Sequence, residues 1–252
     1  MGMSGVQSES SGASSDEACR GAPGPVDSVM VGGWGHEIAR DVSDRVRSLS
    51  PFQAGVRTEL GLPLDRPIVM SGHQAEIWHP GILAKWIAGV EIARRLGGVF
   101  VWLHVDQDVN EPGVIEAPAI DARGCLVKRA LTLVEPTREV PTGSRPAQRI
   151  DPARIRPRDG ATPTDPDALH RLVDALNRHA NEPTLALQFG RAVLGLASRI
   201  AAGNASASEI TTSDLARTGG FGALVELLRD HPARAIATHN EAAARVPDAG
   251  VR

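Results

Sequence analysis

Hydrophobic and polar positions are most regularly ordered between residues 66 and 105. Residues 66–70 form a short apolar run, and residues 71–78 have the composition of a turn and loop. Behind Pro80, apolar residues recur every three or four positions until a pair of glycines, which predicts a helix. Residues 99–105 are apolar at almost every position, as in a strand covered on both faces. The order strand, loop, helix, strand predicts a βαβ unit with parallel strands.

The rest of the chain divides into segments of different composition. Residues 1–30 are rich in Ser, Gly and Ala, which predicts a disordered leader. Residues 31–135 contain the predicted core, which opens with a short amphipathic helix near residues 36–49. Residues 136–165 are rich in Pro, Arg and Thr and indicate a linker loop. The last segment, 166–252, has a helical pattern, with pieces near 166–180, 183–202, 219–230 and 232–246.

These patterns predict an α/β fold with a Rossmann-like parallel sheet core and a helical C-terminal region. Residues 113–120 and 126–135 add two weaker strands, paired as a hairpin around residues 121–124. A doubly wound sheet needs four or more parallel strands, so the core is expected to be incomplete. We therefore expect the N-terminal portion of a longer protein, either as a shortened gene product or as a piece of it.

Composition limits the classes of function. The 252 residues are 42% hydrophobic with a formal net charge of −3, which favours neither nucleic acid nor a basic partner. There is no apolar run of membrane-spanning length and no secretory h-region. Cys19 and Cys125 share no metal-ligand spacing and are not expected to form a structural disulfide. We expect a cytoplasmic protein with a small-molecule substrate, away from membranes.

Polar residues follow both strands of the βαβ unit. Ligands of open α/β sheets bind beyond the carboxyl ends of parallel strands, so neighbouring strands would bring these residues into one crevice. The first set is Ser71, Gly72, His73, Gln74, His79 and Gly81. The second set is His104, Asp106, Gln107, Asp108 and Asn110.

The first set suggests a site for an anion. Lys85, one of the chain's two lysines, could reach back toward an anion held at the helix N-terminus. It fits equally well as a solvated residue on the polar face of the helix. His79 either caps the helix or contacts a ligand, and His73 is either a turn residue or a ligand contact.

The second set suggests acid/base chemistry. Asp106 and Asp108 could handle protons, bind a divalent cation or form an ordinary polar strand end. Two carboxylates without a clear third ligand are a weak metal signal, so no metal site is assigned. His104, inside the strand pattern, fits a hydrogen-bonded buried histidine better than a catalyst. Core packing explains the nearby tryptophans at least as well as a stacking platform; they are Trp78, Trp86 and Trp102.

Two families carry similar motifs. Gly72, followed by His79-Pro80-Gly81, resembles the strand–loop–helix signature of the HIGH-type nucleotidyltransferase superfamily, in which a His-x-Gly-His turn holds nucleotide phosphates. Here Ile82 stands where the second histidine of that turn would fall.

Residues 66–112 more closely resemble the cysteine ligase family of bacillithiol biosynthesis, which has a related Rossmann-like core. Ser71–Gln74 is similar to the family's Thr-Gly-Gln-Gln turn. Pro80-Gly81 and Lys85 are similar to the Gly-Pro pair and the lysine of the family's helix. Phe100 and Trp102 are similar to its Phe-Trp strand end. Asp106–Asp108 is similar to its Asp-His-Asp motif, with Gln107 in place of the histidine.

This resemblance implies a ligase that joins an amino acid to a small amine by a C–N bond, with the carboxylate activated through ATP or another nucleotide. Asp106, Gln107 and Asp108 would then be catalytic. Substrate or nucleotide would contact Ser71, Gly72, His73, Gln74, His79, Gly81, Lys85, His104 and Asn110.

Two other interpretations stay open. One is a non-catalytic domain that binds a small molecule or a partner. The other is half of a split protein, completed as a homodimer or by a second chain. In that case residues 166–246 would provide the interaction surface, with Leu185, Leu187, Val193, Leu194 and Leu196 on its apolar faces.

Overall fold

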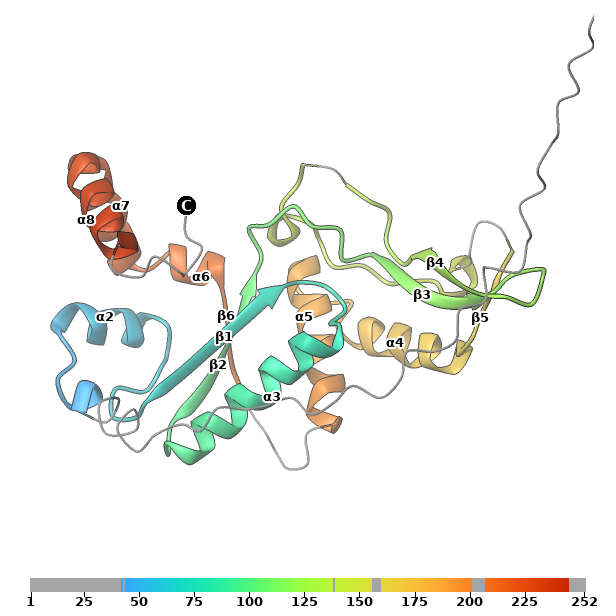
Figure 1. Cartoon of the computed structure of the whole chain (residues 1–252), viewed down its shortest axis with the longest axis horizontal. Coiled ribbons are helices and arrows are strands. Elements are labelled where there is room, and N and C mark those ends of the chain that lie inside the picture. Colours follow the sequence, from blue (N-terminus) through green and yellow to red (C-terminus); the bar gives the residue numbers. More distant parts are fainter. Residues whose placement is uncertain (1–41, 43, 138, 156–159, 201–206, 245–252) are drawn as a thin grey trace, which may run out of the picture.

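The computed structural model describes residues 42, 44–137, 139–155, 160–200 and 207–244. Its fold is α/β, as predicted, with a parallel three-stranded sheet in the order β1-β2-β6. This sheet and its helices form an incomplete Rossmann-like core (Figure 1). The predicted leader lies outside the described residues, as does part of the predicted helix near 36–49, of which residues 44–47 are helical.

The predicted βαβ unit is present. Strand β1 (Ile68–Gln74) leads through helix α3 (Pro80–Arg95) to strand β2 (Val99–Val105), and the two strands pair in parallel. The prediction that residues 71–78 form a loop is wrong for its first half. Residues 71–74 continue β1 because they pair, one by one, with residues 102–105 of β2.

The third parallel strand comes from the segment predicted to be helical. Strand β6 (Ser208–Thr211) pairs with β2, with Val101 opposite Ser208 and His104 opposite Thr211. Four residues are too few to show the alternation of polar and apolar positions by which a strand is predicted. The sheet therefore extends by one strand beyond the predicted 31–135 core.

A second sheet lies beside the first in the order β4-β3-β5 (Figure 1). Strands β3 (Val114–Ile120) and β4 (Leu126–Thr132) form the predicted antiparallel hairpin. At its turn, Asp121 Oδ1 accepts hydrogen bonds from the backbone N–H groups of Arg123 and Cys125. The two-residue strand β5 (Thr162–Pro163) pairs with β3.

The helices match the predicted C-terminal pieces closely and add two others. Helix α2 (Pro51–Glu59) was not expected; it begins with a capping box formed by Ser50 and Gln53. The short helix α6 (Thr212–Ala216) follows β6. The predicted pieces are α4 (Pro166–Arg178), α5 (Leu185–Ile200), α7 (Gly219–Asp230) and α8 (Pro232–Ala244).

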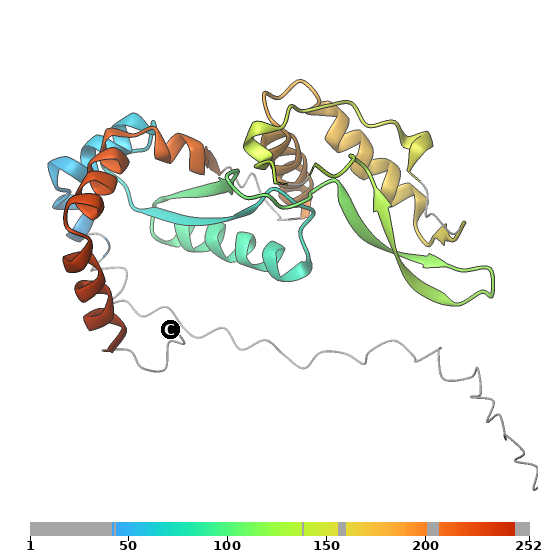
Figure 2. The same cartoon turned by 90° about the horizontal axis from the view of Figure 1, so that it is seen from above.

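Helix α3 runs along one face of the parallel sheet (Figure 2), and side chains of α5 pack into the same cluster. Trp86 of α3 and Leu194 of α5 pack with Phe100 and Trp102 of β2. A Cβ at Gly89 would lie 2.3 Å from the Phe100 ring, so this close helix–sheet contact requires a glycine. The opposite face holds a smaller cluster of Leu62, Val101 and Ile210.

Helix α5 also forms the core beneath the second sheet. Its Leu185 and Phe189 are fully buried and pack with Leu176 of α4 and Leu131 of β4. The hypothesis that Leu185, Val193 and Leu194 form an interaction surface is therefore wrong, because all three are buried within the chain.

The described part of the predicted linker, residues 136–165, packs onto this core. It contains two 3-10 turns, η2 (Thr142–Ser144) and η3 (Pro152–Arg154). The fully buried Gln188 of α5 accepts a hydrogen bond from the N–H of Gln148 and donates one to its carbonyl. These bonds fix the linker against α5.

Helices α7 and α8 are packed much less than α5. Neither contains a buried residue, although α7 contacts α2. Six large apolar side chains on them are exposed: Phe221, Leu224, Val225, Leu227, Leu228 and Ile236. Within the described ranges, no helix combines the length and the apolar character needed to span a bilayer.

Candidate functional site

The loops that follow β1 and β2 contact each other. Gln74, the last residue of β1, donates a hydrogen bond from Nε2 to Asp108 Oδ2 at 2.8 Å. Asn110 donates from Nδ2 to the carbonyl of Ala75 at 2.9 Å. Both contacts form because the parallel pairing ends with Gln74 opposite Val105. We call Gln74, Asp106, Gln107, Asp108 and Asn110 the strand-end cluster.

Asp106 is the most buried member of the cluster, with 4% of its surface exposed. Its Oδ1 accepts hydrogen bonds from Thr212 Oγ1 and from the N–H of Ser213, at the start of α6. Its carbonyl accepts one from the N–H of Gly143 at 2.7 Å. Asp106 thus joins the end of β2 to α6 and η2, and its carboxylate is occupied by the first two residues of α6.

The next residues are more open. Gln107 is exposed and donates from Nε2 to Ser213 Oγ. Asp108 Oδ1 accepts from the N–H of Val109 at 2.8 Å, while Oδ2 holds Gln74. Among the described residues, Asn110 Oδ1 is buried without a hydrogen-bond partner. Leaving such an acceptor unpaired costs about 1–3 kcal/mol, so a donor from a ligand or water would be stabilised there.

His79 caps its own helix. Its Nδ1 accepts from the N–H of Gly81 at 3.0 Å, and its carbonyl accepts from the N–H groups of Ile82 and Leu83. Pro80 has no N–H to offer. The first turn of α3 therefore directs its N–H groups to His79. An anion would have to displace the imidazole, and even then would gain only the Gly81 N–H.

Lys85 points to the sheet. Its Nζ donates to the carbonyl of Gly72 at 2.7 Å and lies 5.7 Å from the centre of the Trp102 ring. A Cβ at Gly72 would lie 2.4 Å from the carbonyl oxygen of Leu103, so β1 approaches β2 closely at this position. In this arrangement the ammonium group ties α3 to β1.

The two remaining histidines of the predicted set lie opposite each other in the β1–β2 register. His73 has its Nε2 2.6 Å from Glu76 Oε1 and is one-fifth exposed. His104 is 1% exposed, as expected for a buried histidine, and its Nε2 lies 3.2 Å from Glu209 Oε2. Ser71 lies in β1, half-buried, and pairs with Trp102.

Glu209 of β6 extends this contact into a network that the sequence did not reveal. Its Oε2 also accepts from Arg191 Nε of α5 at 3.2 Å. Arg191 Nη1 donates to Glu182, whose other oxygen lies 3.3 Å from His179 Nδ1. We call these five residues the face network; they come from β2, β6 and the region of α4 and α5.

The face network holds both of its carboxylates ionised. Burial raises the pKa of Glu209, but the hydrogen bond and charge of His104, followed by those of Arg191, hold it below its ordinary value of 4.5. The hydrogen bond from Arg191 is the largest effect on Glu182 and lowers its pKa, against its partial burial. The same bond raises the pKa of Arg191 further.

A glycine lets α5 lie directly on the buried imidazole. A Cβ at Gly190 would lie 2.3 Å from His104 Nδ1, closer than any side-chain atom can approach. Gly195, one and a half turns further along α5, would meet nothing within 4 Å. The position of Gly190 therefore reflects contact with His104.

A cavity of about 360 Å³ borders the face network. It lies between α3, α5 and the start of β6, and we call it the face cavity. Its wall is formed by Trp86, His179, Arg191, Leu194, Gly195, Ser198, Ala207 and Glu209.

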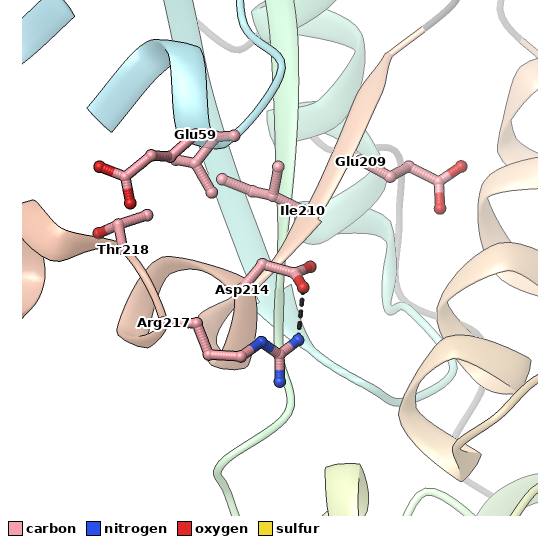
Figure 3. A pocket seen from close by; sticks show the side chains of 7 residues that line it. Glu59, Glu209, Ile210, Asp214, Arg217 and Thr218 are labelled. Carbon is pink, nitrogen blue, oxygen red and sulfur yellow. Dashed lines mark hydrogen bonds and ion pairs between the residues drawn. The ribbon is translucent and has the colours of Figure 1, made fainter. Parts of the chain in front are cut away.

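A second cavity, of about 340 Å³, lies on the other side of β6 between α2 and α6 (Figure 3). Figure 3 shows the Glu209 side chain pointing away from the others that line it. Glu59 accepts from the N–H of Gly219, and Asp214 completes the capping box of α6 with Thr211 and binds Arg217. These acids hold helix ends, so this cavity is a poorer candidate site.

In the part of the chain that the structure describes, no three His, Cys, Asp or Glu side chains come together as a metal site. The fold and the strand-end cluster define an α/β protein with an incomplete Rossmann-like core. No protein-family model matches the chain, and no curated protein or solved structure is significantly similar to it.

Proposed function

We propose that the chain binds a small-molecule substrate at the strand-end cluster and joins an amino acid to a small amine through a C–N bond. The observation that carries this proposal is the contact between Gln74 and Asp108 across the carboxyl ends of β1 and β2. Ligands of open α/β sheets bind at this edge. The unpaired Oδ1 of Asn110 adds an acceptor for a substrate N–H at the same place.

Asp108 is the base in this proposal. It is partly exposed, and its Oδ2 is held by an amide donor, whereas the carboxylate of Asp106 is occupied by α6. The amine nitrogen attacks the acyl carbon of an activated carboxylate, the activating group leaves with its bonding electrons, and the amine proton passes to Asp108. Gln74 and Asn110 orient the amine by hydrogen bonds.

The carboxylate has to arrive activated or be activated on the protein, with ATP or another nucleotide as the proposed source. In the conformation described, His79 and Lys85 both bind backbone groups. We therefore assign no step to the nucleotide phosphates.

Mass spectrometry of products tests the proposal. The chain is incubated with ATP, an amino acid and a panel of small primary amines, and amide products are sought. We expect Asp108→Asn to lower product formation at least 100-fold, since general-base catalysis contributes about 10²–10⁴-fold. Asp167→Asn, on the exposed side of α4, is the matched control and should leave the rate unchanged. Unchanged turnover in Asp108→Asn would overturn the assignment.

A second candidate is a non-catalytic binding domain. The resemblance implies three catalytic residues, and two of them, Asp106 and Gln107, form hydrogen bonds to the start of α6. Side chains that hold a helix in this way favour a structural role over catalysis. Thermal-shift measurements with nucleotides and amino acids separate the two candidates. Stabilisation without any product would support the binding domain, because a ligand that binds only the folded state raises its stability by mass action.

We also propose that a second copy or another chain completes the sheet. Among the described strands, β1 and β6 each pair on one side only. Light scattering over a range of concentrations measures the oligomeric state, and a monomer throughout would contradict the homodimer.

A further inference from the structure

We propose that the face cavity is a second binding site, for a small molecule that carries both a primary amine and an oxygen atom, as in a 1,2-amino alcohol or an α-amino acid. The cavity lies on the α3/α5 face of the sheet and includes none of the strand-end cluster. The inference does not depend on the ligase proposal.

The first observation is an unpaired donor on a residue of the cavity wall. Trp86 is 1% exposed, and its Nε1–H is buried without an acceptor among the described residues. A buried indole N–H normally finds a hydrogen-bond partner. A ligand oxygen in the adjoining cavity would supply one.

The second observation is a carboxylate oxygen without a donor beside the same space. Glu182 and Glu209 share one guanidinium, that of Arg191. His104 and Arg191 both contact Oε2 of Glu209, which leaves Oε1 without a donor in the described part of the chain. An ammonium group in the cavity would donate to Oε1.

The two observations together select the ligand. Glu209 requires an ammonium group, and Trp86 requires an acceptor such as a hydroxyl or carboxylate oxygen. Arg191 and His179 line the same cavity and favour a carboxylate as the second group, while Leu194 and Ala207 leave room for a short apolar stem. A cavity of about 360 Å³ is of the size that holds small molecules.

Calorimetric titration of the whole chain with four compounds tests the site. We expect ethanolamine or L-serine to bind, and propylamine (which lacks the oxygen) and acetate (which lacks the amine) to bind at least tenfold more weakly. Stronger binding of serine than of ethanolamine identifies a carboxylate as the second group, and the reverse identifies a hydroxyl. Failure of both to bind overturns the proposal.

Variants assign the binding to the cavity. Trp86→Phe keeps the ring but removes the donor, and should weaken the preferred amine about tenfold, the value of one hydrogen bond, while leaving propylamine unchanged. Glu209→Gln should weaken all amines. Glu226→Gln, exposed on α7, is the charge-matched control and should change nothing.

Gly195→Leu provides a test that leaves the network intact. Gly195 lines the cavity, and a Cβ there meets nothing within 4 Å, so a larger residue adds a side chain at the cavity wall and its Cβ displaces no packed atom. Circular dichroism confirms that each variant is folded. Binding that persists unchanged in folded Gly195→Leu and Trp86→Phe overturns the proposal. Asp108→Asn should leave this binding intact, which separates the face cavity from the strand-end cluster.

Discussion

The strand-end cluster and the face network are two polar sites built in opposite ways on one parallel sheet. The cluster comes from the ends of β1 and β2, and its residues follow the strands directly in sequence. The network joins His104 to Glu209, which lies 105 residues further along the sequence. Helix α5 lies directly against His104 because position 190 is a glycine. Local polar residues at strand ends thus form an accessible edge, while a buried network depends on long-range packing.

The largest effect should come from disturbing the packing over the network. Gly190→Ala places a Cβ 2.3 Å from His104 Nδ1 and should lower the free energy of unfolding by about 2–3 kcal/mol, the upper part of the usual range for overpacking. Gly195→Ala in the same helix meets nothing and should raise it by about 0.5–1 kcal/mol. Urea denaturation measures both. Equal effects of the two substitutions would contradict the contact between α5 and His104.

Removing the cation of the network should have the next largest effect. Arg191→Met leaves Glu182 and Glu209 without their shared partner, and these carboxylates are only 16% and 30% exposed. Because Arg191 is itself partly exposed, we expect a loss of about 1–2 kcal/mol, less than for a fully buried pair. Arg217→Met breaks an exposed pair with Asp214 and should cost about 0.5 kcal/mol or less. Denaturant midpoints that shift equally in Arg191→Met and Arg217→Met would show that the Arg191 pairs contribute no more than an exposed pair.

Asp106 distinguishes a structural role from a catalytic one within the strand-end cluster. Asp106→Ala removes the acceptor of two hydrogen bonds from the start of α6 and should destabilise the chain by about 1 kcal/mol, the usual net value of a hydrogen bond. Asp106→Asn keeps an oxygen at Oδ1 for both hydrogen bonds and should be nearly neutral. Turnover that disappears in a fully stable Asp106→Asn would show that Asp106, not Asp108, is the base.

The smallest effect is a change in the dependence of stability on pH. The folded pKa values of Glu182 and Glu209 lie below the ordinary value of 4.5. Their contribution is therefore complete above about pH 4.5 and is lost as the pH falls through the folded pKa values. Arg191→Met should make the free energy of unfolding fall less steeply as the pH is lowered from 5 to 3, and denaturation at several pH values in this range measures the slope. If the substitution leaves the dependence of stability on pH unchanged, Arg191 does not lower the pKa values of Glu182 and Glu209.

Much of the fold follows from the order of polar and apolar residues. The βαβ unit, the β3–β4 hairpin and four helices show regular periods over seven or more residues. Two errors have a common cause, since β1 continues through the polar residues 71–74 and β6 has only four residues. In both cases pairing with β2 stabilises a strand that its own residues do not specify.

The sites were predictable to different extents. The meeting of Gln74 with Asp108 follows from two adjacent parallel strands, which the pattern indicated. Nothing near Arg191 or Glu209 in the sequence identifies them as partners of His104, because their contact exists only once α5 lies on the sheet. The sequence also could not predict that α5 is buried while α7 is exposed, because both helices have apolar faces.

The proposed substrate site at the ends of β1 and β2 is tested most directly by NMR titration of the isotope-labelled chain with an amino acid and ATP. We predict that the amide shifts concentrate in residues 72–76 and 106–110, and that Asp108→Asn weakens them. Saturable shifts confined to other parts of the chain, such as α7 and α8, would contradict the assignment of the substrate to the strand-end cluster.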